Sequence, residues 1–140
     1  MQTTETKKNI NVVACVLKKK EKLLIASRPE MKTFPGFFEF PGGKVDKEEC
    51  LIEALEREIF EELGITLDFN KIYYLNNYKI LKQNISLHFF LCLRWFGKIE
   101  NKEKQILKWI FPTKLNNYKF LKSNKSFISF LNNFIFPTAH

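Results

Sequence analysis

The stretch GKVDKEECLIEALEREIFEELGI, from Gly43 to Ile65, predicts the central helix of the fold. Asp46 is followed three residues later by Glu49, which is the spacing of a capping box at the start of a helix. Gly64 stands where helices commonly end in a left-handed turn. We therefore expect a helix over about residues 47–63.

The acidic residues near the C-terminal end of this helix share its apolar face. The stripe begins with the aliphatic residues Leu51, Ala54 and Leu55. At about 100° per residue, Glu58 and Glu62 continue the stripe and Glu61 lies beside them. Such acids repel one another and meet the negative end of the helix dipole. Arg57 supplies one positive charge, but clustered carboxylates indicate Mg²⁺ or Mn²⁺; an internal salt-bridge cluster without metal is the alternative.

Strand-like segments lie on both sides of this helix. Two apolar, β-branched runs at 9–18 and 22–27 are separated by a charged turn and predict a hairpin. A loop rich in proline and glycine follows, around a short strand at 37–40. Further strands are expected at 71–81, 85–96 and 105–111, and a final amphipathic helix at 126–136. This order predicts an α/β (α+β) fold in which a mixed β-sheet is sandwiched between helices.

Length and composition predict one compact domain over residues 1–140. The chain is 45% hydrophobic, and its fifteen Phe and two Trp can fill a sizeable core. Met1 to Lys8 is polar, so we expect neither a signal peptide nor a membrane anchor, and a monomer in the cytoplasm. Cys15, Cys50 and Cys92 are widely spaced among apolar neighbours, which predicts small core residues and not disulfides or a metal site.

The net charge of +8 allows two interpretations. A basic surface attracts nucleic acids, membranes or substrates that carry several phosphates. However, only three of the 23 basic residues are arginines, which is typical of AT-rich coding without any partner. The lysine-rich, aromatic segment Lys114–Phe136 is an alternative nucleic-acid surface, but Phe127, Phe130, Leu131 and Phe134 recur at helical spacing and are expected to pack on the core. We therefore expect no stable nucleic-acid partner.

The residues from Gly43 to Ile65 fit the Nudix box: Gly, five residues, Glu, seven residues, then Arg-Glu-apolar-any-Glu-Glu-any-Gly-apolar. Every fixed position is met, at Gly43, Glu49, Arg57, Glu58, Ile59, Glu61, Glu62, Gly64 and Ile65. The chain resembles the Nudix hydrolases and, within them, the MutT group of 8-oxo-dGTP diphosphatases, through EFPGGK at Glu39–Lys44 and through Ile85–Trp109. The resemblance implies the Nudix fold and a metal-dependent enzyme that converts 8-oxo-dGTP to 8-oxo-dGMP and pyrophosphate, which protects DNA from mutation.

The same resemblance implies a metal site made of Glu61, Glu62, the carbonyl of Gly42 and Glu103 of the acidic loop. Mg²⁺ is the expected ion, and Mn²⁺ can substitute for it. Because glycine has no side chain, Gly42 and its neighbour Gly43 are expected to let the backbone approach metal and phosphate closely.

The catalytic roles implied by the resemblance fall on the box itself. Glu58 is the expected general base or water-orienting group. Arg57 and Glu49 are expected to hold the loop and the helix in register.

Asn124 stands where the MutT group has its base-reading asparagine. Oxidation at C8 places a hydrogen on N7 of guanine, so that edge offers one acceptor and one donor, which an amide can meet. Phe40, Ile85 and Leu87 are implied as the apolar walls of the base pocket, with Arg28 near its entrance. The alternative for Asn124 is an N-cap of the last helix.

Two departures from the MutT pattern bear on the substrate. Glu48 replaces a glycine that is common just inside the box, and Leu121 with Lys122 replaces a frequent Pro-Pro pair at the edge of the base pocket. The alternatives are a Nudix hydrolase of another nucleoside diphosphate derivative, such as an ordinary dNTP, ADP-ribose or a dinucleoside polyphosphate, and a non-catalytic nucleotide-binding module. Such modules usually lose the box acids, which this chain retains.

Overall fold

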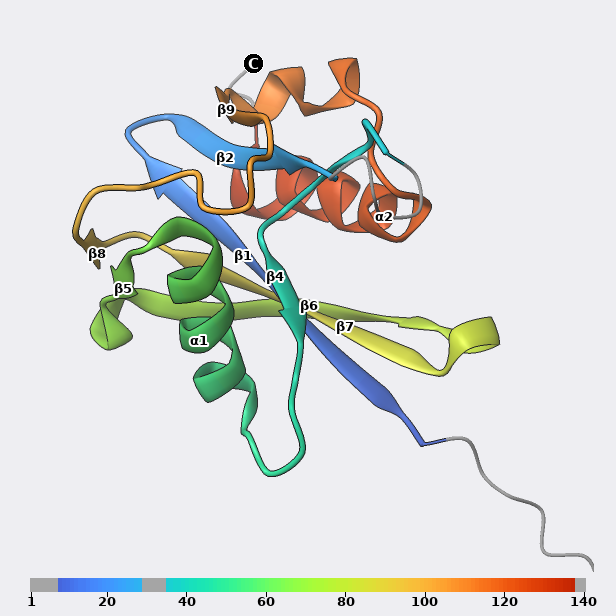
Figure 1. Ribbon diagram of the computed structural model, residues 1–140. Helices are drawn as coiled ribbons and strands as arrows, with labels where there is room; N and C mark the ends of the chain where they lie inside the picture. Colours follow the sequence, from blue (N-terminus) through green and yellow to red (C-terminus); the bar gives the residue numbers. More distant parts are fainter. Residues whose placement is uncertain (1–7, 29–34, 138–140) are drawn as a thin grey trace, which may run out of the picture.

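A computed structural model describes residues 8–28 and 35–137 as a mixed β-sheet between two helices (Figure 1). The seven-stranded sheet runs in the order β3-β2-β1-β7-β6, and β4 and β9 pair with β1 and β2. Its strands are β1 (Ile10–Lys19), β2 (Lys22–Ser27), β3 (Phe38–Glu39), β4 (Gly42–Lys44), β6 (Ile72–Ile80), β7 (Ile85–Cys92) and β9 (Leu107–Ile110). The helices are α1 (Leu51–Leu63) and α2 (Lys122–Phe130). The predicted sandwich of a mixed sheet between helices is confirmed.

The centre of the sheet is the parallel pair of β1 and β7, which aligns Ile10 with Ile85 and Leu17 with Cys92. The predicted hairpin is also confirmed, because β1 turns into antiparallel β2 with Lys19 opposite Lys22. Side chains alternate along β1, so each face of the sheet receives its own apolar layer. One layer packs on α1 and the other on α2. The acidic helix α1 is thereby fixed on one face, with its apolar stripe inward.

The layer beneath α2 is rich in aromatic rings. Phe89 of β7 and Phe127 of α2 stack with their centroids 3.6 Å apart. Phe127 and Leu131 are fully buried, as expected, but Phe134 is 73% exposed, so its predicted core position is wrong. The cause is local: Leu131–Ile135 forms the π-turn η4, which breaks the helical spacing beyond α2. The helix also begins at Lys122, earlier than predicted.

Helix α1 begins at Leu51, so the predicted start near residue 47 is wrong. Its N-cap is Cys50, whose backbone N–H donates to Glu53 Oε1 at 2.9 Å. Asp46 N–H does donate to Glu49 Oε1 at 2.8 Å, but this bond closes a turn ahead of the helix. Glu48 follows with a φ of 75°, a left-handed conformation that no helix residue adopts. The C-terminal prediction is confirmed, because Gly64 caps α1 with a φ of 72°.

The predicted strand 85–96 is interrupted at residues 93 and 94. After β7 ends at Cys92, the short strand β8 (Trp95–Phe96) leaves the main sheet and pairs with β5 (Thr66–Leu67). The carbonyl of Arg94 accepts bonds from the Cys92 thiol at 3.0 Å and from the backbone N–H of Asp68 at 3.0 Å. These contacts stabilise the bend between β7 and β8. Short turns complete the chain, namely η1 (Phe69–Lys71), η2 (Leu81–Gln83) and η3 (Pro112–Asn117).

The three cysteines occupy two kinds of environment. Cys15 and Cys92 are fully buried beneath α1, as predicted, whereas Cys50 is exposed, so its predicted place in the core is wrong. Burial, with Cys92 and Glu62 nearby, holds the pKa of the Cys15 thiol well above its usual range. Over residues 8–28 and 35–137, no helix is both long and apolar enough to cross a membrane.

Candidate active site

A cavity of about 320 Å³ lies where β3 and β4 meet the C-terminal half of α1. Within residues 8–28 and 35–137, four carboxylates reach it from three separate parts of the chain: Glu39 from β3, Glu58 and Glu62 from α1, and Glu103 from the loop before β9. Its remaining lining is Gly42, Gly43, Lys44 and Gln105. Such a concentration of hard oxygen donors suits a divalent cation or the positive groups of a ligand.

The two glycines of β4 make this cavity possible by letting two other groups come close. A Cβ at Gly42 would stand 1.9 Å from the carbonyl oxygen of Val13 on β1. A Cβ at Gly43 would stand 2.4 Å from the carboxyl carbon of Glu58. A side chain at either position would thus displace the strand or the carboxylate. In this structure the close approaches are made to β1 and to Glu58, and the approach of this backbone to metal and phosphate stays a prediction.

Arg57 ties the loop ahead of α1 to the cavity. Its Nε donates to Glu49 Oε2 at 2.7 Å and its Nη2 to Glu49 Oε1 at 2.9 Å, which is a bidentate ion pair. Nη2 also donates to the carbonyl of Lys44 at 3.0 Å, and Nη1 donates to Glu58 Oε1 at 2.9 Å. The hydrogen bonds from Arg57 and from the backbone of Asp46 lower the pKa of Glu49 to about 2. One guanidinium therefore orients the loop and a cavity carboxylate together.

Glu58 and Glu62 are both harder to ionise than a carboxyl group in water. Burial raises the pKa of Glu58 even though Arg57 acts in the opposite direction. Burial, followed by the charges of Glu58, Glu39 and Glu103, raises the pKa of Glu62 to about 8. A backbone hydrogen bond from Gly42 counteracts only part of that shift. Clustered acids with raised pKa values mark a site that needs a cation to hold all of its charges.

The loop that carries Glu103 is held against the C-terminal end of α1. The backbone N–H of Glu100 donates to the carbonyl of Leu63 at 2.8 Å, and that of Lys102 donates to the carbonyl of Glu62 at 3.2 Å. These bonds satisfy carbonyls that the helix end leaves without partners. Gln105 N–H donates to Asn101 Oδ1 at 2.9 Å and closes the turn. The loop is thereby held where Glu103 lines the same cavity as Glu62.

Glu61 does not line the cavity. Its side chain is 52% exposed and pairs with Nη1 of Arg57 at 3.4 Å. The prediction that it shares the buried face with Glu58 and Glu62 is therefore wrong: Glu61 lies at the edge of that face, about 60° around the helix from Glu58, and the packing of α1 leaves it in solvent. In the described part of the chain, no three acidic, histidine or cysteine side chains stand in a metal-coordinating arrangement. The ligand role of Glu61 stays a prediction that requires its carboxylate to turn inward.

Glu39 lines the cavity although the sequence analysis assigned it no role. It pairs with Nη1 of Arg28 at 2.8 Å, so the residue predicted at the base entrance is linked directly to the carboxylate cluster. Its place in the EFPGGK stretch, three residues before Gly42, was the available signal. Lys44 and Gln105 were also missed; among the described residues of the lining, Lys44 is the one basic side chain.

The residues predicted to bind the base lie in and around the α2 face of the sheet. Phe40 and Leu87 are buried in the core layer there, and Phe120 stacks on Phe40 at 5.7 Å. Ile85, at the start of β7, is half-buried and lies outside that core cluster. Asn124 is 4% exposed. Its side chain is the third of α2, whose N-cap is Leu121, so the alternative of Asn124 as an N-cap is wrong.

Comparison with known proteins gives a consistent picture. The family model of the NUDIX domain matches residues 7–131. The 8-oxo-dGTP diphosphatase of Buchnera aphidicola subsp. Schizaphis graminum is 36% identical over 129 residues, which cover 92% of this chain and 98% of that protein. The CTP pyrophosphohydrolase of Escherichia coli is 34% identical over 105 residues, which cover 75% of this chain and 78% of that protein.

Solved structures share the arrangement of elements. A MutT structure from work on Aliivibrio salmonicida and Vibrio cholerae superposes with a TM-score of 0.78 at 30% identity and covers 89% of this chain and 97% of that one. The solution structure of the E. coli ORF135 protein superposes with a TM-score of 0.77 at 28% identity and covers 93% of this chain and 94% of that one.

Proposed function

The chain belongs to the NUDIX domain family, and from this premise we propose that it is a metal-dependent nucleoside triphosphate pyrophosphohydrolase that acts on 8-oxo-dGTP. The observation that carries the hydrolase proposal is the convergence of four carboxylates and the two close-packed glycines in one cavity. The substrate proposal is supported by the relatives named 8-oxo-dGTP diphosphatase, from Buchnera and from Haemophilus influenzae.

The donor set of the cavity fits a divalent metal ion, which family members need. Glu62 and Glu103 already line the cavity, together with the backbone of Gly42, and Glu61 is one helix position away. These four would hold the ion, for which we propose Mg²⁺, with Mn²⁺ as a substitute. When bound, the ion neutralises phosphate charge and activates water toward phosphorus.

The chain's own residues supply the remaining chemistry. Glu58 has a raised pKa and is held by Arg57, so its carboxylate is oriented to take the proton of the attacking water. Lys44 places a positive charge in the cavity, where it would bind a phosphate oxygen of the substrate. Water adds to phosphorus as the bond to the pyrophosphate leaving group breaks, which gives the nucleoside monophosphate and pyrophosphate.

For the base, we propose that Asn124 reads the oxidised edge between the walls formed by Phe40, Leu87 and Ile85. Phe120 stacks on Phe40 in this structure, so a base that stacks on the same face of Phe40 would take the place of the Phe120 ring. Arg28, paired with Glu39 at 2.8 Å, would close the site on the side of the carboxylate cavity.

A second candidate is hydrolysis of an ordinary nucleoside triphosphate, which the likeness to the CTP pyrophosphohydrolase favours. Purified protein incubated with 8-oxo-dGTP, dGTP, CTP, ADP-ribose and a dinucleoside polyphosphate, each with Mg²⁺ and with Mn²⁺, separates these substrates. We expect the highest kcat/KM for 8-oxo-dGTP, with pyrophosphate as product. A higher value for CTP would favour the second candidate, and no hydrolysis with either metal would contradict both. The single-domain organisation, the cytoplasmic location and the monomeric state remain predictions.

A further inference from the structure

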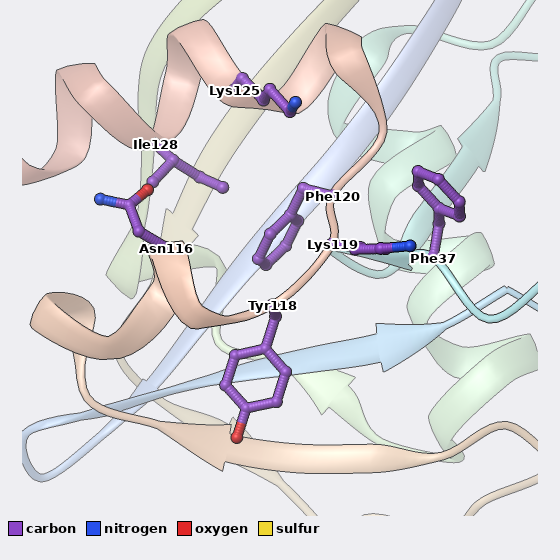
Figure 2. A pocket seen from close by; sticks show the side chains of 7 residues that line it. All are labelled: Phe37, Asn116, Tyr118, Lys119, Phe120, Lys125 and Ile128. Atoms are coloured by element: carbon purple, nitrogen blue, oxygen red, sulfur yellow. The ribbon is translucent and has the colours of Figure 1, made fainter.

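A second cavity, of about 510 Å³, lies beside the connection between η3 and α2 (Figure 2). Its described lining residues are all different from those of the carboxylate cavity. Its lining combines three aromatic rings, two ammonium groups and an amide, from Phe37, Tyr118, Phe120, Lys119, Lys125 and Asn116. None of these side chains takes part in the proposed metal binding or proton transfer, although Phe120 also stacks on Phe40 of the proposed base site.

The backbone holds aromatic and basic groups together here. The N–H of Phe38 donates to the carbonyl of Lys119 at 2.7 Å, which fixes Phe37 next to Lys119. The Lys119 ammonium lies 5.9 Å from the centroid of the Phe37 ring, and the Lys108 ammonium lies 5.7 Å from that of the Tyr118 ring. Each of these two rings therefore has a positive charge over its face.

Among the described residues, the two charged side chains that line this cavity, Lys119 and Lys125, are both basic. From Lys104 to His140 the sequence contains six lysines and no acidic residue. The carboxylates of the other cavity all precede this segment. Biased coding explains an abundance of lysine, but it does not place ammonium groups over aromatic rings in a cavity. The combination fits a ligand that carries both phosphates and flat bases.

We propose that this cavity binds single-stranded nucleic acid, with bases stacked on Phe37 and Tyr118 and phosphates bound by Lys119 and Lys125. A strand fits better than a mononucleotide because the Tyr118 ring and Lys125 lie on opposite sides of Phe120 (Figure 2). Lys108, over Tyr118, extends the basic surface further. Exposed lysines bind phosphates through counterion release, so the binding is weak and salt-sensitive, in keeping with the absence of a stable nucleic-acid partner expected from the sequence.

The test measures fluorescence anisotropy of a labelled oligo(dT) of about 12 nucleotides with the full chain in EDTA, so that hydrolysis plays no part. Each lysine–phosphate contact with a single strand contributes a slope of about −0.7 to log K against log salt. The double variant K119Q/K125Q should flatten the slope by about 1.4 and weaken binding roughly ten-fold at low salt. The control K79Q/K82Q removes the same charge from exposed lysines of the β6–η2 region and should leave binding nearly unchanged.

A second pair of variants tests stacking. Tyr118→Leu should weaken binding about ten-fold, whereas Tyr118→Phe keeps the ring and should bind as the natural chain does. Thermal unfolding shows whether Tyr118→Leu, which loses an edge-to-face contact with Phe38, is still folded. If Tyr118→Leu is not folded, the proposal is tested by comparing K119Q/K125Q with the control K79Q/K82Q.

Three outcomes would overturn the proposal. Equal weakening by K79Q/K82Q would show that net charge alone binds the strand. Competition by dTMP at the same phosphate concentration would show a site for free nucleotides. Competitive inhibition of 8-oxo-dGTP hydrolysis by oligo(dT) would show that the cavity is part of the hydrolytic site. This proposal does not depend on the proposed hydrolase function, because binding is measured in EDTA. The binding result can therefore be interpreted even if the chain hydrolyses no nucleotide.

Discussion

Replacing Glu62 with glutamine is expected to stabilise the metal-free protein. Burial and the neighbouring carboxylates raise the Glu62 pKa to about 8, against an ordinary value of 4.5. Since the folded pKa is the higher one, the folded state binds more protons than the unfolded chain between these two pH values. The contribution of Glu62 to stability is thus fully present below about pH 4.5 and is lost as the pH rises to about 8.

The magnitude follows from the difference between the two pKa values. From 4.5 to about 8 is about 3.5 units, and each unit corresponds to about 1.4 kcal/mol, which gives an upper limit of about 5 kcal/mol above pH 8. Local relaxation and water entry reduce this figure. Glutamine has nearly the same shape and no charge. The variant should therefore unfold roughly 10 °C above the natural chain at pH 9, with little difference at pH 5.

The assay is thermal unfolding by circular dichroism in EDTA at pH 5, 7 and 9. Glu56→Gln, on the same helix but outside the cavity lining, is the matched control and should leave the pH dependence unchanged. With Mg²⁺ and substrate, Glu62→Gln should lower kcat about 10³-fold, because a proposed metal ligand is lost. Parallel Tm curves for variant and natural chain would refute the electrostatic reasoning. Near-normal kcat would refute the ligand role.

Three further changes test other parts of the site. Glu103→Ala should raise the Mg²⁺ concentration needed for half-maximal activity more than it weakens nucleotide binding measured in EDTA; an unchanged metal requirement would make Glu103 an ordinary surface residue. Asn124→Ala should lower the ratio of kcat/KM for 8-oxo-dGTP to that for dGTP by roughly 10²-fold or more, and a retained ratio would exclude base reading. Glu48→Gly should raise the free energy of unfolding by up to about 1 kcal/mol in urea, because Glu48 has a φ of 75°; lower stability would contradict the strain argument.

The sequence predicted correctly those elements that are determined by residues close to them in the chain. The charged turn between two β-branched runs predicted the β1–β2 hairpin, and Gly64 predicted the end of α1. The start of α1 was predicted wrongly because it depends on Arg57, eight residues after Glu49. Arg57 forms a bidentate ion pair with Glu49, and the helix begins only after Glu48, which has a left-handed conformation. The spacing of Asp46 and Glu49 is real, but it closes a turn that the capping rule cannot distinguish from a helix start.

The residues of the candidate site were also predicted correctly where the local pattern determines them and wrongly where packing does. The helical period predicted that Glu58 and Glu62 turn inward, and both line the cavity. Glu61 lies at the edge of that face, where only the packing of α1 on β1 and β4 determines whether a side chain is buried. Glu39 was missed because it stands in a strand of two residues, too short to show a period. Its position depends on how β3 pairs with β2, which the sequence does not encode locally.

The unequal burial of the cysteines has a practical consequence for spectroscopy. Cys15 and Cys92 are closed off in the core, whereas the thiol of Cys50 is open to solvent. A maleimide dye added under native conditions should therefore couple at Cys50 alone, directly after Glu49 and its ion pair with Arg57. Because this label sits at the N-cap of the helix that carries Glu58 and Glu62, its emission would report movements of that helix in real time, in the natural chain and without any engineered substitution.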